Sequence, residues 1–464
     1  MSEFISALAT GVWTPVLFLL ILGGVFFLLY SRFIPYKYVG HTFAVLRGKY
    51  DNPDDPGQIN AYEALSTALA STVGMGNIAG VAAAISIGGP GALFWMWVTA
   101  IVGMSTNFFT STLSVMYKGK DSEGEIQGGP MYVIREALSK NWYPLAVLFC
   151  LCASIGCLPI FQANQLTQII VDIGITSEPI KTSFFSIGGI EINTAKFLIG
   201  STLMIISGFV IIGGIQRIGL WAGKMVPLMI IIYFLSVLAI LVLNIASVPE
   251  YLGMMFTDAF AAENYRGEPL LGGVVGGLIV TGVRRASFSN EAGIGTAPMA
   301  LGASKSKEPI REGLVSMLSP AIDTLLVCTL TALAILVTGV WKTSEASGVS
   351  LTVTAFESSL GFTGKILLLI SAFFFAITSL FSYSYYGNKA ISFLFGVKAG
   401  RYYDYFYLST IIFGAILSMR DVMNIIDIAY ALMAIPTMVS GFILAPKVMK
   451  EAKEYFARLE SRRK

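Results

Sequence analysis

The fold of this chain is decided by a ten-residue stretch in the middle of an apolar run, STVGMGNIAG at residues 71–80. Three glycines and an asparagine in so short a stretch disfavour a continuous helix. The surrounding run, residues 62–87, is long enough to cross a bilayer, which takes about 20 residues. Because lipid cannot satisfy a broken backbone, such a break survives only where it lines a polar cavity or is buried in protein. The stretch therefore predicts an interrupted membrane helix with a functional centre at the break.

The composition of the whole chain indicates a membrane protein. Of 464 residues, 55% are hydrophobic and 13% are charged, and the mean hydropathy is +0.72. A soluble domain carries about 25% charge, so this chain has too little polar surface to cover itself in water. We expect an all-α polytopic membrane protein with about eleven transmembrane helices. The apolar runs are residues 13–31, 62–87, 91–117, 144–171, 195–214, 220–245, 271–299, 312–340, 363–390, 404–419 and 422–446.

The common motifs of soluble enzymes are missing from the sequence. It has no HExxH motif, no CxxC pair and no phosphate-binding loop, and its four cysteines lie in apolar runs as small core residues. The single histidine, His41, lies in a polar connector. We therefore expect no enzyme activity, no cofactor and no nucleic-acid partner.

Lysine and arginine are concentrated in alternate connectors. The connectors after the first and third apolar runs are rich in both, as is the C-terminal segment 447–464. Basic connectors face the cytoplasm, so an odd number of helices places the N-terminus outside the cell membrane and the C-terminus in the cytoplasm. The C-terminal segment is typical of a basic amphipathic helix, which is either a topology anchor or a contact with anionic membrane lipid.

A second apolar run, residues 271–299, carries a similar interruption. It contains GGVVGGLIVTGVRR at 272–285 and SNEAGIG at 289–295, and it comes five helices after the first interruption. Paired broken helices at matching positions of two inverted repeats are the best sequence pointer to a transporter site. Close helix packing explains the glycines of 272–277 equally well, whereas Asn77 adds a polar group at membrane depth and favours the functional interpretation of the first break.

These repeats divide the chain into four parts. The division is 1–61 for a leading transmembrane helix and its cytoplasmic connector, 62–245 for the first five-helix repeat, 246–446 for the second, and 447–464 for the basic tail. A break in a helix exposes amide donors at the start of one half-helix and carbonyl acceptors at the end of the other. The donors suit a carboxylate and the carbonyls suit a hard cation such as Na⁺.

Several sequence blocks resemble the alanine or glycine:cation symporter family. GGPGALFWMWVTAIVG at 88–103 matches the family signature position for position, and GGPMY at 128–132, SNEAG at 289–293 and AIP at 434–436 resemble further blocks. The resemblance implies sodium-coupled uptake of small neutral amino acids by alternating access. It also implies the leucine-transporter architecture: one leading helix, then a 5+5 inverted repeat whose broken helices are the second and seventh of the chain.

The resemblance also implies a sodium site. Its ligands would be the carbonyls of Ala70, Val73 and Phe375 and the hydroxyls of Thr378 and Ser379. Taken alone, the hydroxyl pair is explained equally well by hydrogen bonds to its own helix backbone.

The substrate site implied by the resemblance lies beside the sodium site. The carboxylate would face the amides of the first break, and the ammonium would face carbonyls of the second break around Ile279 to Thr281. Gln162 matches a glutamine of the family pocket, although it is also typical of a residue that joins two helices. The expected substrate residues are Thr72, Gly74, Met75, Gly76, Asn77, Gln162, Ile279, Thr281, Ser379 and Tyr383.

The sequence departs from the family at two pocket positions. Thr281 and Tyr383 stand where relatives often have tryptophan. A smaller or more polar side chain makes the pocket roomier or more polar. The expected substrates therefore extend from glycine and alanine to serine or glutamine.

Asp323 lies in the middle of the eighth predicted span, Glu291 lies in the seventh and Asp427 in the eleventh. An intramembrane acid is costly unless it is paired, so each is a functional candidate. The structural alternative is an ion pair or cap, with Arg284 or Arg285 as possible partners of Glu291 or Asp323. Coupling to protons through Asp323 or Glu291 is the rival to sodium coupling. An ion channel is a rival of another class, but no repeated filter sequence is present.

Overall fold

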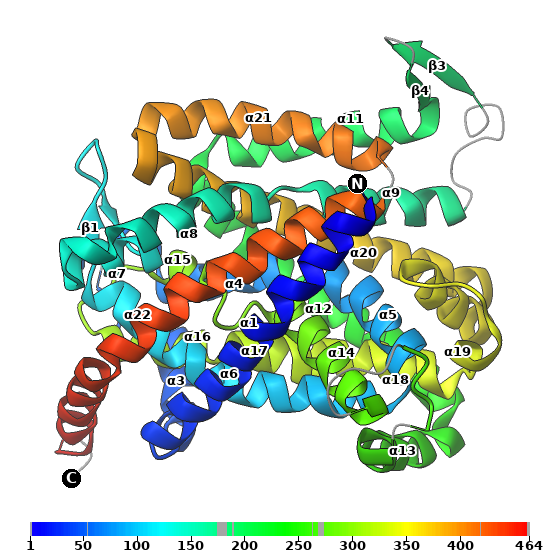
Figure 1. Ribbon diagram of the computed structural model, residues 1–464, viewed down its shortest axis with the longest axis horizontal. Coiled ribbons are helices and arrows are strands. Elements are labelled where there is room, and N and C mark those ends of the chain that lie inside the picture. Colours follow the sequence, from blue (N-terminus) through cyan, green and yellow to red (C-terminus); the bar gives the residue numbers. More distant parts are fainter. Residues whose placement is uncertain are drawn as a thin grey trace.

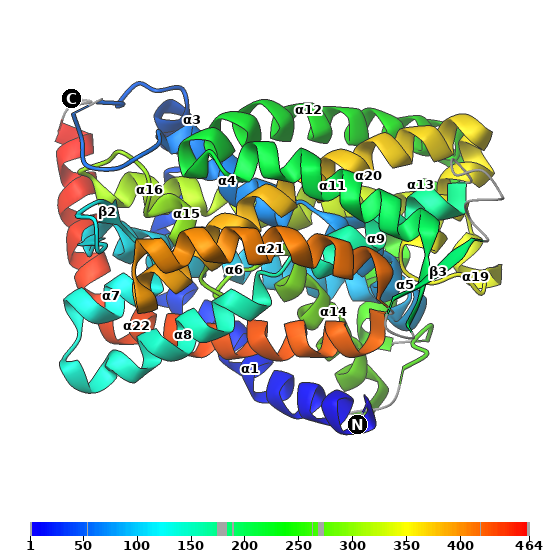
Figure 2. The same cartoon turned by 90° about the horizontal axis from the view of Figure 1, so that it is seen from above.

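The computed structural model describes residues 2–52, 54–173, 183–187, 190–261, 263–267, 273–417 and 419–461. Figures 1 and 2 show a bundle of long helices with a two-stranded hairpin at each end. The hairpins pair β1 (Gly119–Lys120) with β2 (Ile126–Gln127) and β3 (Phe184–Ile187) with β4 (Ile190–Asn193). The expected all-α polytopic fold is confirmed.

Nine of the expected spans have the length and hydropathy of a membrane helix. Among the described residues, eight single helices are long and apolar enough to cross a membrane, and one pair of helices joined by a bend brings the total to nine. The other two expected spans, α14 (Gly273–Asn290) and α21 (Val397–Ile416), are more polar but pack against neighbouring spans, α14 against α6 and α21 against α11 and α20. The long helices are α1 (Ser2–Tyr30), α6 (Gly91–Met116), α8 (Tyr143–Gly156) with α9 (Ile160–Ile173), α11 (Thr194–Ile211), α12 (Gly214–Leu243), α16 (Pro309–Ser316) continuing through α17 (Leu318–Pro320), the π-helical turn η4 (Ala321–Cys328) and α18 (Thr329–Val337), α20 (Val349–Phe395), α21 (Val397–Ile416) and α22 (Met419–Ser461).

The two ends of the bundle are distinct. The basic end carries α3 (Val39–Leu46), α7 (Pro130–Ala137) and the last turns of α22, whereas the far end carries α13 (Val248–Ala261) and α19 (Val340–Thr343) (Figures 1 and 2). The tail predicted as a separate helix is a direct continuation of α22 to Ser461. Residues 462–464 of that tail and Gly272 lie outside the described residues.

The first broken helix has its break where the sequence predicts it. It consists of α4 (Ala61–Thr72), the π-helical turn η1 (Gly76–Gly80) and α5 (Val81–Gly88), bent by 48°. A capping box starts α4, in which the Asn60 side chain accepts from the Glu63 amide and the Glu63 carboxylate accepts from the Asn60 amide. These caps replace the hydrogen bonds that the first turn of a helix lacks.

The second broken helix breaks later than expected. Helix α14 (Gly273–Asn290) is continuous, the chain turns through residues 291–295, and α15 (Thr296–Leu301) follows. The predicted break around Ile279 to Thr281 is therefore wrong. The glycines there allow close packing instead, since a Cβ on Gly282 would lie 2.7 Å from the Ala92 carbonyl oxygen and from the Trp95 Cβ.

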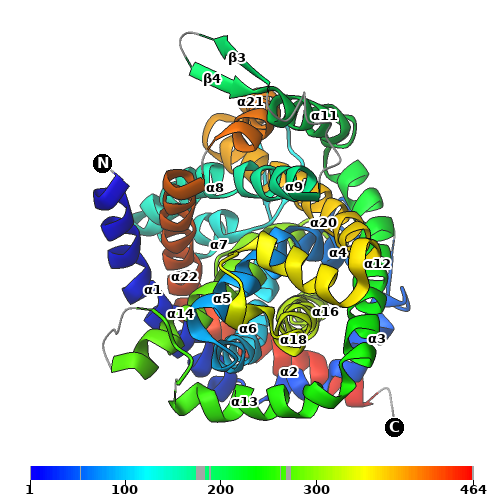
Figure 3. The same cartoon turned by 90° about the vertical axis from the view of Figure 1, so that its right-hand side faces the viewer.

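The two broken helices run in opposite directions through the centre of the bundle. Helix α4 packs against α15, and α5 packs against α14, so the first half of each helix lies beside the second half of the other. Figure 3 shows α4 and α5 of the first broken helix inside the bundle, with α1 on its outside. This antiparallel arrangement is what an inverted repeat requires. The boundaries of the four-part division stay a prediction.

Candidate functional site

The first break is held open by two side-chain amides. The Gly74 amide donates to Asn77 Oδ1 at 2.8 Å, and the Met75 amide donates to Gln162 Oε1 of α9 at 2.9 Å. In a continuous helix these amides would donate to the carbonyls of residues 70 and 71. The break thus presents amide donors on one side and freed carbonyl acceptors on the other, as the sequence predicts.

Ser379 of α20 reaches the same point from the opposite side. Its hydroxyl donates to the Ser71 carbonyl at 3.4 Å and to the Phe375 carbonyl at 2.9 Å. A Cβ on Gly74 would overlap Ser379 Oγ and lie 3.1 Å from Gln162 Nε2. Because both neighbours crowd the site, position 74 has no room for a side chain.

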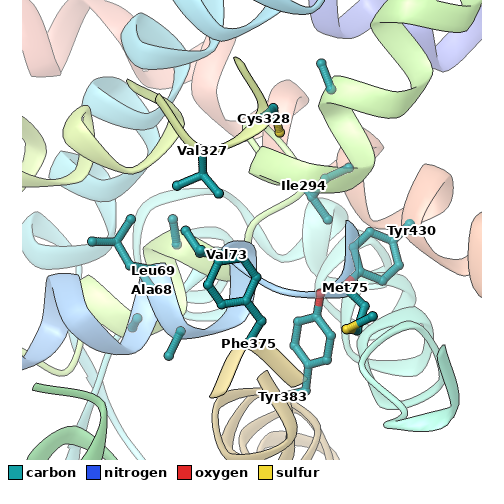
Figure 4. Packing of buried hydrophobic residues seen from close by; sticks show 14 of the residues in the cluster. Ala68, Leu69, Val73, Met75, Ile294, Val327, Cys328, Phe375, Tyr383 and Tyr430 are labelled. Carbon is teal, nitrogen blue, oxygen red and sulfur yellow. The ribbon is translucent and has the colours of Figure 1, made fainter. Parts of the chain in front are cut away.

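Two other hydroxyls of the predicted sites, those of Thr378 and Thr72, donate to carbonyls of their own helices. Thr378 Oγ1 donates to the Phe374 carbonyl at 2.8 Å, and Thr72 Oγ1 donates to the Ala68 carbonyl at 3.2 Å. Figure 4 shows the Phe375 ring beside Val73 at the end of α4. The structure therefore brings the segment of Ala70 and Val73 together with that of Phe375 and Ser379. A sodium-ligand role for these residues stays a prediction.

A buried carboxylate joins the two broken helices. Asp323, in the π-helical turn η4, is fully buried and accepts from Asn77 Nδ2 at 2.6 Å, from Ser289 Oγ at 3.0 Å and from Thr324 Oγ1 at 2.7 Å. Asn77 belongs to the first break and Ser289 to the end of α14. Three donors compensate the charge that burial would otherwise penalise.

The second break is organised around another buried carboxylate, Glu291. It accepts hydrogen bonds from the hydroxyls of Tyr383, Tyr430 at 3.1 Å and Ser71 at 3.5 Å. Its φ of 55° is one of the few positive values outside glycine, and such backbone strain persists only where the surroundings enforce it. Figure 4 shows the Tyr383 and Tyr430 rings on either side of Met75.

The structural alternative, in which Arg284 or Arg285 pairs with Glu291 or Asp323, is not found among the described residues. Arg284 forms an ion pair with Asp427 of α22 instead. Both arginines lie more than one helical turn before the break at Glu291. They therefore line a cavity next to Asp427 and not the break.

A cavity of about 570 Å³ opens next to that ion pair. Among its lining residues are Gly80 of the first broken helix, Phe161 and Gln165 of α9, and both Arg284 and Asp427. Phe161 also stacks edge to face on Phe288, with centroids 5.5 Å apart. This aromatic pair borders the cavity through Phe161 and the first break through Phe288, whose ring lies 3.9 Å from where a Gly76 Cβ would be.

Two predicted substrate residues lie away from the first break. Thr281 donates to the Gly277 carbonyl at 2.9 Å and lines a separate cavity of about 270 Å³ together with Trp13 of the leading helix. Ile279 is partly buried against the hydrophobic core. Both stand in the continuous part of α14, so their carbonyls are used within the helix, and their role in binding stays a prediction.

The sequence reasoning missed how the polar residues are paired. Asn77 and Asp323 each signal a polar function at membrane depth, but 246 residues separate them. Tyr430 gives no signal of its own, since a tyrosine in an apolar run is ordinary. A π-helical turn at 321–328 has no glycine to reveal it.

Comparisons with known proteins agree with this architecture. A profile of the sodium:alanine symporter family matches residues 1–464. The chain is 35% identical to the sodium/alanine symporter AgcS of Methanococcus maripaludis, over 96% of this chain and 95% of that one. It is 31% identical to the probable sodium/glutamine symporter GlnT of Bacillus subtilis, over 96% and 88%. The crystal structure of MhsT in complex with L-phenylalanine shares the fold, with a TM-score of 0.57 and 15% identity, over 84% of this chain and 89% of that one.

Proposed function

The chain belongs to the sodium:alanine symporter family, and on that premise we propose that it takes up a small neutral amino acid together with Na⁺ across the cell membrane. A member of this family is a multi-pass membrane transporter and not an enzyme. The substrate, the coupling ion and the orientation are the parts we propose.

The observation that carries the proposal is the convergence of Gln162 and Ser379 on the first break. The Gln162 oxygen on the Met75 amide stands where a carboxylate oxygen of the substrate would bind. An amide side chain has donors as well as an acceptor. Gln162 therefore turns its Nε2 donor toward the carboxylate when the carboxylate takes over the Gly74 and Met75 amides.

The proposed cation site lies at the end of α4, beside the amides. A hard cation prefers oxygen ligands, and the carbonyls of residues 70 and 71 have lost their helical donors here. The Ser379 hydroxyl already points at the Ser71 carbonyl. When Na⁺ binds, Ser379 and Thr378 turn their hydrogens away and offer lone pairs, joining the carbonyls of Ala70, Val73 and Phe375.

The proposed cycle is alternating access across the two ends of the bundle. The Phe161–Phe288 pair and the Arg284–Asp427 ion pair close the path from the far-end cavity to the first break. We take the far end as the outside and the basic end as the cytoplasm. One Na⁺ moving down about 100 mV supplies about 2.3 kcal/mol, and a tenfold gradient adds about 1.4 kcal/mol. Together they support accumulation of roughly several hundredfold.

The proposed substrates are alanine and glycine, with serine and glutamine as larger candidates. The Tyr383 hydroxyl binds Glu291, so its polar edge is fixed inside the protein, where relatives often carry an apolar tryptophan. A panel of amino acids scored by thermal shift ranks them, because a ligand that prefers the native state raises its apparent stability. A melting temperature raised by phenylalanine more than by any of these four would contradict this assignment.

The experiment that tests the proposal is uptake of radiolabelled alanine and glutamine into proteoliposomes, with and without an inward Na⁺ gradient. We expect uptake above the external concentration only with Na⁺. Equal uptake in Na⁺ and in K⁺, for every small neutral amino acid, would refute sodium coupling.

Proton coupling is the second candidate, favoured by the position of Asp323 between both broken helices. A proton on this carboxylate would weaken its hold on Asn77 and so link protonation to the shape of the first break. Uptake driven by a pH gradient in Na⁺-free buffer, abolished in Asp323→Asn, would select this candidate over sodium.

A further inference from the structure

A pocket of about 310 Å³ at the basic end stands apart from the transport path. It lies between α3, the start of α16 and the last turns of α22, three segments that meet at this end of the bundle (Figures 1 and 2). The residues that decide its chemistry are His41, Lys49, Glu308, Arg311, Tyr455 and Arg458.

The pocket carries an excess of positive charge. Lys49, Arg311 and Arg458 face one carboxylate, Glu308, which leaves two net positive charges with His41 neutral. Glu308 is paired with Arg458 at 2.9 Å. In the described part of the chain, neither Lys49 nor Arg311 has a carboxylate within salt-bridge distance.

Arg311 is held in place by aromatic rings instead of an acid. Its guanidinium lies 4.5 Å from the centroid of Tyr50, and its Nε lies 3.3 Å from the Tyr455 hydroxyl. That hydroxyl also lies 2.6 Å from His41 Nε2. Stacking and a single Nε hydrogen bond fix the plane of the guanidinium while its terminal amino groups remain available. A guanidinium held in this way is prepared to bind the oxygens of an anion in a bidentate manner.

The start of α16 adds partial positive charge to the same pocket. The helix begins with Pro309 after Glu308, and no side chain caps its first amides. The positive end of a helix favours an anion. The three cations and the start of α16 come from three separate segments that line the same pocket.

We propose that this pocket binds a phosphate group, supplied by the headgroup of an anionic membrane lipid or by a free phosphate compound. A phosphate offers several strong acceptor oxygens to a fixed guanidinium and a nearby ammonium. The pocket joins the connector before α4, the helix that leads into Asp323, and the tail of α22. An occupied pocket therefore stabilises the basic end in the arrangement seen here.

The test measures binding to the purified full-length protein and does not depend on transport. The probes are short-chain phosphatidylglycerol, short-chain phosphatidylcholine and glycerol phosphate, each titrated while the melting temperature is followed. The variants are Arg311→Gln and the exposed Lys49→Gln, and the matched control is Lys453→Gln, an exposed lysine of the same tail helix. Lys49→Gln keeps the test decisive if Arg311→Gln fails to fold.

We expect phosphatidylglycerol to raise the melting temperature of the wild-type protein and of the control. Each pocket variant should need about fivefold more probe for half of the effect. An equal response to glycerol phosphate would identify the free phosphate as the ligand, whereas a response to phosphatidylglycerol alone would identify the lipid. The proposal would be overturned if neither phosphatidylglycerol nor glycerol phosphate raised the melting temperature, or if Lys49→Gln and Lys453→Gln gave the same titration. Either result is independent of what the protein transports.

Discussion

The two helix breaks solve the same structural problem in different ways. In the first break, the loosened amides of Gly74 and Met75 are satisfied by neutral amide oxygens of Asn77 and Gln162. In the second break, the carboxylate of Glu291 collects three hydroxyl donors. A neutral oxygen is replaced by a substrate carboxylate at little cost, whereas a buried carboxylate that loses its donors is strongly penalised. We infer that the first break exchanges ligands and the second is a fixed point.

Ser71 connects the two breaks. Its carbonyl accepts from Ser379, beside the proposed cation site, and its hydroxyl donates to Glu291 in the second break. The same residue also lies 3.2 Å from the Tyr386 hydroxyl. The Ser71 hydroxyl also lies 2.8 Å from the Ala68 carbonyl oxygen of its own helix. Ser71 is therefore the residue through which we expect a change at the proposed cation site to reach the second break.

The largest expected effect comes from filling the first break. Gly74→Ala places a methyl group against Ser379 Oγ and Gln162, and overpacking of this kind costs about 1–3 kcal/mol. We expect sodium-driven uptake in proteoliposomes to fall by about 10- to 100-fold. The matched control is Gly253→Ala in α13, away from both breaks, where a Cβ meets nothing within 4 Å. Equal activity of both variants would show that the first break tolerates a side chain.

The next effect is on stability and concerns the second break. Glu291→Ala leaves the buried hydroxyls of Tyr383 and Tyr430 without their acceptor, at about 1–3 kcal/mol for each group. We expect a lower melting temperature, with the Na⁺ concentration for half-maximal residual uptake unchanged. Glu291→Gln keeps an acceptor oxygen and should lie between this variant and the wild type. A normal melting temperature with a weakened Na⁺ response would instead place Glu291 in the ion site.

The difference between the breaks also explains what the sequence could predict. The first break is local: three glycines and Asn77 within residues 71–80 are enough to indicate it. The second break is indicated by glycines as well, but Gly277 and Gly282 lie where a side chain would crowd neighbouring segments. The turn at Glu291 follows a continuous helix. A glycine-rich run does not distinguish packing from interruption unless its neighbours are known.

The pairing of side chains was the least predictable part of the site. The resemblance pointed to Ser379 and Gln162, and both lie at the first break. Pattern alone could not tell that Arg284 faces Asp427, because the helices that carry them are far apart in sequence. Nor could it reveal that Ser379 contacts the Ser71 carbonyl of the first broken helix in addition to its own helix, whereas Thr378 bonds back to its own helix.

A smaller effect is expected at the cation side of the first break. Ser379→Ala removes one proposed ligand, and a lost hydrogen-bonding or ligand interaction of this size weakens Na⁺ binding by about tenfold. The order in which substrates compete for uptake should not change. The control is Ser384→Ala, whose hydroxyl donates only to the Phe381 carbonyl of its own helix. If the half-saturating Na⁺ concentration is the same in both variants, Ser379 does not belong to the ion site.

The smallest effect is a pH dependence at the basic end, where one lysine joins the segment before α4 to the segment after α15. Lys118 donates to the carbonyls of Pro56 at 2.8 Å and Ser304 at 2.6 Å, which lie before α4 and after α15. Burial lowers the pKa of its ammonium group to about 8, an effect that the carboxylates of Glu312 and Asp55 oppose. If the basic end opens and water reaches Lys118, its pKa returns toward the usual value of 10.5.

The closed arrangement therefore binds this proton less tightly than an open one. A rise in pH favours the state with fewer bound protons, so the basic end should close further between pH 7 and 9. Spin labels on Asp54→Cys and Lys307→Cys, at two exposed positions on either side of the contact, report the distance. We expect the ratio of the longer-distance to the shorter-distance population to fall by up to about tenfold on alkalinisation, and to be independent of pH in Lys118→Met. Growth of the longer-distance population at pH 9 would contradict this expectation. It would mean that the charged Lys118 ammonium, through its hydrogen bonds to the Pro56 and Ser304 carbonyls, stabilises the closed arrangement.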